Sequence, residues 1–329
     1  MSGARGSLDE EFNTDDLPSS PSIISIGKYH NATHHQDGLF SFVYRAESPK
    51  EIIEDDPTSK PLHRIVALKV TTPSLMTEPH DSQREARILQ QSCHEHIIPL
   101  LDVFQQAGGR LVLVFPFLPF DLETVLRKDR LNPESAKSHL SDLFRALEFL
   151  HARGIIHRDV KPSNILLKTA SGPAYLSDFG IAWSPEDTAS EEAHEKITDV
   201  GTTSYRPPEL LFGNKSYGCS LDLWAAGCVA AECTSLSSRT LFDAGELGSE
   251  LALIQSIFRS LGTPTLGNWP VNGLPCLCRV PVSPSLTVSR KQQIFRTGGR
   301  WPSTSFPPNH GQSYYPKLHQ MRGILLASS

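Results

Sequence analysis

The amino-acid sequence predicts an α+β fold of two lobes, a small β-rich lobe followed by a mostly helical one. Short runs of β-branched and aromatic residues at 40–46, 64–70 and 110–118 indicate strands. After residue 121 the apolar residues recur at helical spacing instead. The two patterns meet at residues 116–121, so we expect the lobes to be joined there, with a cleft between them.

Length and composition exclude several classes of protein. The chain has 329 residues, of which 39% are hydrophobic and 20% charged, enough for one large domain or two lobes. A net charge of -5 gives no general attraction to nucleic acids or to anionic membranes. No apolar run approaches the ~20 residues that cross a bilayer, and the N-terminus lacks the apolar core of a signal peptide. We therefore expect an intracellular protein with no membrane or nucleic-acid partner.

The β-rich part is expected to contain one main helix. SQREARILQQ, at residues 82–91, has helical spacing between the second and third strands. Residues 1–22 are acidic and rich in Ser and Pro, which predicts a disordered tail. The acidic stretch SPKEIIEDDPTSKP, at residues 48–61, is expected to be a solvated loop.

Three helices are expected in the second part. The first is capped by Asn132, has Pro133 in its first turn and ends before Gly154. The second, at residues 221–236, is apolar nearly all round and should lie in the interior, whereas the third, at 246–262, is amphipathic.

Beyond Trp269 the sequence loses any sustained period. It is dense in Pro, Ser and Gly, so residues 270–329 are expected to be a poorly ordered tail.

HRDVKPSNILL at residues 157–167, followed by DFG at 178–180, carries the strongest chemical signal. Phosphoryl transfer needs a carboxylate to orient the attacking hydroxyl, a cation to offset charge on the moving phosphate, and oxygen ligands for Mg²⁺. The stretch supplies these parts in order as Asp159, Lys161, Asn164 and Asp178. The alternative, that they are ordinary turn residues, is disfavoured by the joint string and its spacing.

A second signal is the lysine of VALKV, Lys69, together with Glu85 in the expected helix. A lysine inside a β-run needs partners for its ammonium group, here phosphates and a helix carboxylate. The alternative is a solvated edge lysine and a surface glutamate.

These motifs resemble the eukaryotic protein kinase family, from about residue 23 to Trp269. The resemblance implies a bilobal protein kinase fold that transfers the γ-phosphate of ATP, with Mg²⁺, to Ser or Thr of a protein substrate. Lys161 fits the serine/threonine-specific branch. In this reading Asp159 is the catalytic aspartate, Asn164 and Asp178 are the metal ligands, and Lys69 and Glu85 form the phosphate-anchoring ion pair.

Within the family the nearest resemblance is to cyclin-dependent kinases, carried by RLVLVFPFLPFDLETVL, TTSYRPPELLFG and SLDLWAAGCVAAE. It divides the kinase domain, residues 23–269, into an N-lobe (23–115), a hinge (116–121) and a C-lobe (122–269). A cell-cycle role and a nuclear or cytoplasmic location are implied. The resemblance also assigns Phe115 to guard the back pocket, the backbone of Pro116 and Leu118 to adenine, Leu166 to the floor of the adenine pocket, and Asp121 to the ribose.

The chain departs from this branch at the helix that binds cyclin, where TEPHDSQREARIL replaces the usual sequence, so the need for a cyclin stays open. The activation segment contains Thr198, Thr202 and Glu209, and its stretch SPEDTASEEAHEK holds five carboxylates. That stretch is either a solvated loop or a substitute for a phosphate beside Arg158, provided by Glu191, Glu192 or Glu195. The substitute would suit fungal single-subunit kinases that activate cyclin-dependent kinases, which would make another such kinase the substrate.

The glycine-rich loop is also altered. HQDGLFSFVY aligns with G-x-G-x-F-G-x-V so that Gln36, Gly38 and Ser41 occupy the three glycine positions. Phe40 keeps the tip position and Val43 the roof over adenine. With one glycine left, the backbone should approach phosphate less closely.

The last departure follows Trp269, where we find no Asp-Pro-x-x-Arg string to supply the arginine that pairs with the family counterpart of Glu209. The last helices of the family are therefore expected to be missing. We prefer a shortened or mis-predicted reading of the chain as the explanation over a functional truncation. Two functions remain open: an active serine/threonine kinase, or a non-catalytic kinase-fold binding protein or inactive truncated product.

Overall fold

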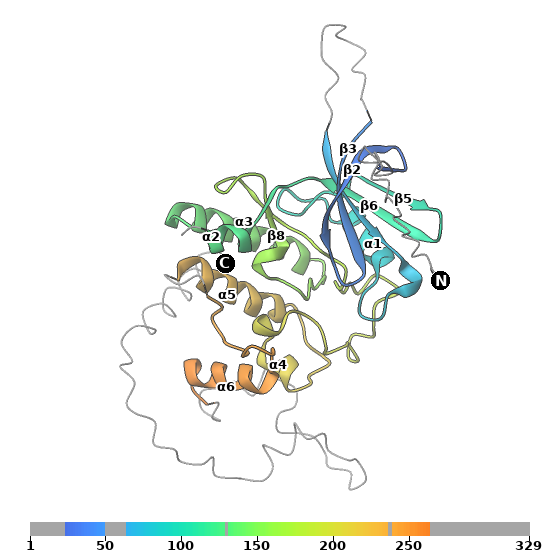
Figure 1. Ribbon diagram of the computed structural model, residues 1–329. Helices are drawn as coiled ribbons and strands as arrows, with labels where there is room; N and C mark the ends of the chain where they lie inside the picture. The colour runs from blue at the N-terminus through green and yellow to red at the C-terminus, as the bar shows by residue number, and fades with distance from the viewer. Residues whose placement is uncertain (1–23, 50–63, 129–130, 236–238, 264–329) are drawn as a thin grey trace, which may run out of the picture.

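The computed structural model describes residues 24–49, 64–128, 131–235 and 239–263 (Figure 1). A β-sheet with one helix and a mostly helical part form two lobes, and the predicted α+β fold is confirmed (Figure 1). The two predicted tails, Trp269 and nearly all of the acidic stretch at 48–61 lie outside the described residues.

The first lobe is built on a six-stranded antiparallel sheet in the order β1-β2-β3-β4-β6-β5. Buried aliphatic side chains of β4 and β6, including Leu68 and Val112, form its core. The strands are β1 (Ile24–Ile26), β2 (Tyr29–Asp37), β3 (Ser41–Glu47), β4 (Ile65–Thr71), β5 (Asp102–Gln106) and β6 (Arg110–Pro116).

Helix α1 (Ser82–Gln91) covers one face of this sheet and occupies the residues predicted for it. Asp81 begins it by accepting hydrogen bonds from the backbone N–H groups of Gln83 (2.8 Å) and Arg84 (3.0 Å). Its side chains Ile88 and Leu89 belong to the large core of the second lobe, so α1 contacts both lobes.

Three strands of the first lobe, β1, β2 and β5, were not predicted. β2 (YHNATHHQD) is polar and mostly exposed, so it shows no apolar alternation. It becomes a strand because its backbone pairs with β3, a partner that local sequence does not specify.

The chain crosses to the second lobe between Pro116 and Leu122. Strand β7 (Phe120–Asp121) pairs there with β8 (Ile165–Leu167), which pairs in turn with β9 (Ala174–Leu176). The remaining elements are η1 (Pro73–Leu75), α2 (Leu122–Lys128), α3 (Pro133–His151), η2 (Pro162–Asn164), η3 (Thr203–Tyr205), α4 (Pro208–Leu211), α5 (Ser220–Thr234) and α6 (Glu250–Leu261).

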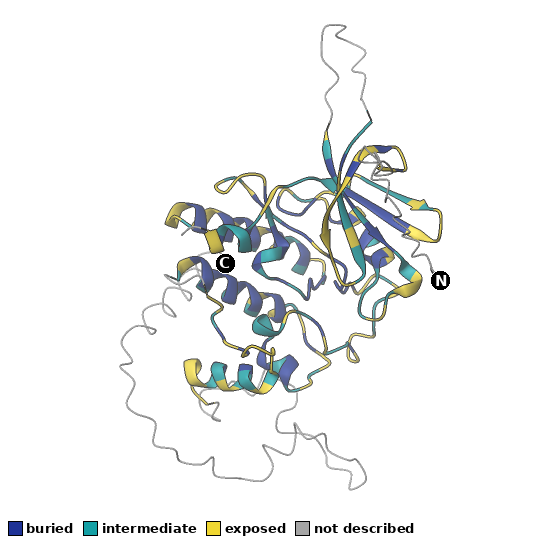
Figure 2. Ribbon diagram, in the orientation of Figure 1, coloured by how far each residue is buried: buried dark blue, intermediate teal, exposed yellow. Residues whose placement is uncertain are grey.

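The predicted helical signals of α3 and α5 are confirmed. The Asn132 side chain accepts a hydrogen bond from the Ser135 backbone N–H (2.7 Å), and Gly154 follows the helix with φ 70°. α5 is buried along most of its length, as its apolar sequence indicated, whereas the outer side of α6 is exposed (Figure 2). The two helices and α4 share a small core around Phe242 and Leu253.

The predicted start of the third helix, at residue 246, was wrong. α6 begins at Glu250, and Ser249 caps it by accepting a hydrogen bond from the Ala252 backbone N–H. Gly245 and Gly248 both adopt positive φ (70° and 62°), a conformation incompatible with a continuous right-handed helix. The helical spacing of apolar residues continued to residue 246 because this spacing depends on side chains and carries no information about backbone angles.

No helix in the described part of the chain combines the length and apolarity needed to cross a bilayer.

We predict that Leu147→Ala destabilises the protein by about 2–5 kcal/mol, because the side chain is 1% exposed and its removal leaves a cavity in the large core. Leu251→Ala, at a position 59% exposed on α6, should change the free energy of unfolding by about 0.5 kcal/mol or less. Urea denaturation of both variants measures the difference. Similar losses would contradict this assignment of the core.

Candidate active site

The loop between α3 and β8 is held by one buried carboxylate, that of Asp222 on α5. Asp222 accepts hydrogen bonds from the backbone N–H groups of His157 and Arg158, both 2.9 Å long. The His151 ring lies at the same distance from Asp222. These contacts satisfy a carboxylate that is 0% exposed and fix the start of the loop to α5.

Two non-glycine residues of the site adopt positive φ, Arg158 (70°) and Asp178 (63°). This conformation is uncommon for such residues and persists where surrounding contacts over-determine it. For Arg158 the backbone bond to Asp222 and a fully buried side chain do so. The first predicted motif therefore contains a backbone position that the tertiary structure enforces.

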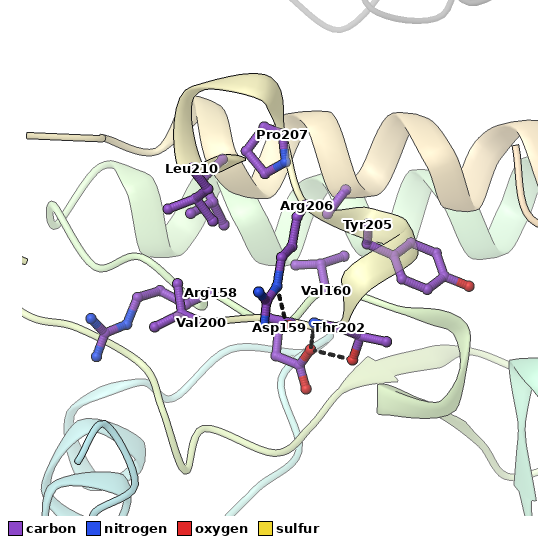
Figure 3. A pocket seen from close by; sticks show the side chains of 12 residues that line it. Arg158, Asp159, Val160, Val200, Thr202, Tyr205, Arg206, Pro207 and Leu210 are labelled. Carbon is purple, nitrogen blue, oxygen red and sulfur yellow. Dashed lines mark hydrogen bonds between the residues drawn. The ribbon is translucent and has the colours of Figure 1, made fainter. Parts of the chain in front are cut away.

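Asp159 lies at the centre of a small polar group. Its carboxylate is 2.9 Å from the Lys161 Nζ and accepts hydrogen bonds from the Asn164 amide (3.1 Å) and from the Thr202 hydroxyl (2.9 Å) and backbone N–H (3.0 Å). Lys161 also donates to the Thr202 hydroxyl, at 2.9 Å. Figure 3 shows Asp159 and Thr202 pointing toward each other beside a small pocket. The carboxylate can therefore accept a hydroxyl hydrogen while a cation lies beside it.

Thr202 reaches Asp159 because a glycine precedes it. Gly201 has φ 74°, and a Cβ at that position would lie 2.7 Å from the Arg158 carbonyl oxygen. Any residue with a side chain at position 201 would push the activation segment away from the loop between α3 and β8. Arg206 fixes the same turn by donating to the Gly201 carbonyl (2.9 Å; Figure 3).

Lys69 joins three segments through its ammonium group. The Nζ atom lies 2.7 and 2.8 Å from the two oxygens of Glu85 on α1 and 2.8 Å from Asp178 Oδ1. Glu85 is 1% exposed, so the pair is not a solvated lysine and a surface glutamate. Burial would lower the pKa of Lys69, but the charges of Asp178 and Glu85 outweigh it and raise the pKa above its usual range.

Asp178 and Asn164 provide the oxygen atoms suited to a hard cation. The Asp178 side chain is 48% exposed, and the Lys69 charge holds its pKa well below the usual range, so it is ionised. Asn164 uses its amide nitrogen to bond the Asp159 carbonyl (2.8 Å), which leaves Oδ1 as its candidate ligand atom. Carboxylate and amide oxygens are ligands that Mg²⁺ accepts, so these residues fit the metal.

The residues assigned to adenine lie on elements that meet at the lobe junction. Val43 on β3 is opposite Lys69 on β4, and Phe115 and Pro116 end β6. Phe115, Leu118 and Leu166 are partly buried and pack against the same large core.

Asp121 has a role that the sequence did not show. Its two carboxylate oxygens accept hydrogen bonds from the backbone N–H and the hydroxyl of Thr124, both 2.7 Å long, which fixes the first turn of α2. The contact to a ribose remains a prediction.

The altered glycine-rich loop is a β-hairpin whose tip is closed by a hydrogen bond from the Gly38 N–H to the Ser41 carbonyl (2.7 Å). Gln36 lies opposite Val43 in the hairpin. The Phe40 ring contacts the His80 ring, with centroids 4.9 Å apart. Burial lowers the pKa of His80, which favours the neutral ring in this contact.

Arg158 binds only one of the three candidate glutamates of the activation segment, Glu191. Its buried guanidinium donates to Glu191 Oε1 (2.9 Å) and to the Tyr217 hydroxyl (3.1 Å). Glu195 pairs instead with Lys215 at 2.6 Å, and Glu192 is exposed. Burial would raise the pKa of Glu191, but Arg158 holds it below its usual value, so Glu191 is a carboxylate.

The two other residues named for the activation segment lie away from this pair. Thr198 is partly buried next to Asp199, which binds Arg206 at 2.8 Å. Burial raises the pKa of Glu209, whose carboxylate accepts a hydrogen bond from Ser220 at 3.5 Å. The region after Trp269, where the resemblance places a pairing arginine, lies outside the described residues.

Sequence reasoning missed three groups that border the site: His80, Trp183 and the ion pair of Arg87 with Asp187. The Trp183 indole donates to the Glu191 carbonyl (2.8 Å) and so fixes that glutamate. The sequence did offer a signal for the ion pair. Arg87 is a basic residue three positions after Arg84 on α1, and the activation segment is acidic. Nothing local marked His80.

Comparison with known proteins agrees with this geometry. The protein kinase domain family matches residues 58–269. The serine/threonine-protein kinase csk1 of Schizosaccharomyces pombe is 37% identical over 241 residues, which cover 72% of this chain and 74% of csk1.

Two further relatives carry the name of a cyclin-dependent kinase. Cyclin-dependent kinase 7 of Xenopus laevis is 37% identical over 73% of this chain and 64% of its own length. Cyclin-dependent kinase D-1 of Oryza sativa is 39% identical over 57% of this chain and 42% of its own. The chain thus spans less than two thirds of these two relatives. By its family match, its relatives and its fold, the chain belongs to the protein kinase family, as a serine/threonine kinase similar to cyclin-dependent kinases.

Proposed function

We propose that this protein transfers the γ-phosphate of ATP to serine or threonine hydroxyls of another protein. The observation that carries the proposal is the contact of Lys69 with both Glu85 and Asp178, because it brings a strand, a helix and the DFG motif to one point. Glu85 is buried, so its charge depends on this lysine. The lysine and both of its acidic partners are present and in contact, which favours catalysis over a non-catalytic binding role.

Each polar residue has a distinct role in this reaction. Lys69 would position the phosphates, and Asp178 and Asn164 would hold Mg²⁺, which neutralises charge on the phosphate oxygens. Asp159 would orient the attacking hydroxyl in the way that it accepts the Thr202 hydroxyl. Lys161, which is 2.9 Å from Asp159, would offset the charge of the transferring group.

The ATP would lie under the hairpin of β2 and β3. Val43 would cover the adenine and Leu166 would lie beneath it, with the backbone of Pro116 and Leu118 along its edge and Phe115 behind. Gly38 would approach the phosphates, and Asp121 would reach the ribose from the start of α2. The partly buried aliphatic and aromatic surface of these residues suits a flat purine.

Another cyclin-dependent kinase is the substrate that we propose, with a role in the cell cycle. The resemblance to fungal kinases that activate cyclin-dependent kinases supports this substrate class, and the similarity to csk1 and to cyclin-dependent kinase 7 is consistent with it. Glu191 supports it as well, because an enzyme that begins a phosphorylation cascade benefits from needing no phosphate of its own.

Free thiols support a reducing, intracellular location, in the nucleus or the cytoplasm. Cys93, Cys219, Cys228 and Cys233 are unpaired, and burial raises the pKa of Cys228 above its usual range and that of Cys233 to about 12. Buried neutral thiols are resistant to oxidation.

Regulation follows from the position of Glu191, which we propose takes the place of a phosphate on the activation segment. Its carboxylate lies 2.9 Å from Arg158, whose backbone is part of the catalytic loop. A phosphate on Thr198 would then be unnecessary for activity.

The catalytic proposal predicts that Asp159→Asn lowers kcat by at least about 100-fold, because the amide orients the hydroxyl less well and cannot accept its proton. The purified chain is assayed with ATP and Mg²⁺, on a basic peptide and on a catalytically inactive cyclin-dependent kinase. Equal incorporation by the two proteins, or none by a folded wild-type chain, would instead favour the non-catalytic reading.

The regulatory proposal predicts that Glu191→Gln lowers kcat/KM for the peptide about tenfold or more, since even ~1.4 kcal/mol of lost positioning has that effect. Glu192→Gln is the matched control, because that side chain is exposed, and it should have no effect. Thr198→Ala should also retain activity, and its inactivity in a recombinant protein would refute the role of Glu191.

The hairpin predicts that restoring glycine at Gln36 and Ser41 lowers the KM for ATP several-fold. Glycines would let the backbone N–H groups approach the phosphates, whereas the Ser41 side chain now lies against Gly38. Steady-state kinetics at varied ATP measure the change. An unaltered KM would mean that the hairpin does not contact the phosphates.

A further inference from the structure

Helix α1 carries Glu85, the partner of Lys69. The contacts that fix α1 therefore determine whether this ion pair can form. One side of the helix packs on the sheet through Ala86, and Ile88 and Leu89 reach the large core. Another side presents two arginines, Arg84 and Arg87, one helical turn apart. Both arginines contact the activation segment.

Arg87 and Asp187 form a two-point ion pair. The Arg87 Nε lies 2.7 Å from Asp187 Oδ2, and its Nη2 lies 3.0 Å from Oδ1. The Asp187 side chain is 7% exposed, whereas that of Arg87 is 43% exposed. The bidentate geometry fixes orientation as well as distance, because both nitrogen atoms of the fork are engaged.

Two more contacts join the N-terminal half of α1 to the same segment. The buried Arg84 donates to the Ala189 carbonyl (3.1 Å), and the backbone N–H of Asp81, the helix cap, donates to the Gly180 carbonyl (3.0 Å). The helix is therefore attached at its cap, in its first turn and in its middle to residues 180–189.

The segment that receives these contacts is itself ordered by local bonds. Asp187 Oδ1 also accepts a hydrogen bond from the Ala189 backbone N–H (2.9 Å), and the Ser190 side chain accepts one from the Ser184 N–H (3.2 Å). The turn then leads to Glu191, which is bound to Arg158 of the catalytic loop. A continuous set of contacts thus joins the catalytic loop to α1.

We propose that Arg87 and Asp187 are positioning residues, which keep Glu85 on Lys69 from within the chain so that α1 needs no protein partner to hold it. This inference rests on the proposed kinase function. Arg87 and Glu85 lie on the same ten-residue helix, which moves as one body, so a rotation of α1 that moved Glu85 away from Lys69 would also break the ion pair.

Arg87→Gln and Asp187→Asn test the pair. Each should lower kcat/KM for a peptide substrate about tenfold in the isolated chain, with a rise in the KM for ATP, because Lys69 loses its fixed partner. The double variant should be little worse than either single one, since both remove the same interaction. Arg87→Lys, which keeps the charge but loses the fork, should fall between wild type and Arg87→Gln.

Hydrogen exchange of the α1 amides gives a readout that does not depend on catalysis. Faster exchange in residues 82–91 is expected for Arg87→Gln and Asp187→Asn. Lys215→Gln is the matched control, because it breaks an exposed ion pair with Glu195 in the same segment, and it should leave both exchange and activity unchanged.

The outcomes separate this inference from the proposed function. Unchanged α1 exchange in both variants, or activity losses that add in the double variant, would overturn the positioning role. A folded wild-type chain with no activity would refute the proposed function, and the exchange comparison would still decide whether the ion pair holds α1.

Discussion

The fully buried guanidinium of Arg158 is the group on which the arrangement of the site depends. A buried charge left unpaired costs several kcal/mol, comparable with the stability of a whole domain, so its surroundings must supply acceptors. The Ile181 carbonyl and the Glu191 carboxylate, both in the activation segment, and the Tyr217 hydroxyl accept hydrogen bonds from it. These contacts of the Nε and Nη1 atoms fix the activation segment against the catalytic loop.

A series of ion pairs extends from Arg158 and Glu191 to Lys69 at the proposed ATP site. Asp187 binds Arg87 close to Glu191, and Glu85 on the same helix binds Lys69, which contacts Asp178. Each of these pairs has at least one buried partner, whose desolvation is offset only by good hydrogen-bond geometry, so the set favours one arrangement over many similar ones. The two lobes are thus coupled by charge as well as by the apolar contacts of α1.

Local sequence signals predicted the elements whose cause is local. α1 and α3 have a polar cap followed by helical apolar spacing, and the structure has both. The strand β2 and the start of α6 escaped prediction, since one depends on a partner strand and the other on glycine backbone angles. The sequence also predicted the motif residues, because the chemistry of phosphoryl transfer requires them at this spacing along the chain. These residues are Asp159, Lys161, Asn164 and Asp178.

By itself, the sequence determined the kinase motifs, the two-lobe fold and the acidic character of the activation segment. Tertiary structure alone decided that Glu191, and not Glu192 or Glu195, meets Arg158, and that Asp187 meets Arg87. These partners are separated by 33 and 100 residues. Periodicity and capping act over a few residues, whereas such pairs form only when packing brings distant segments together.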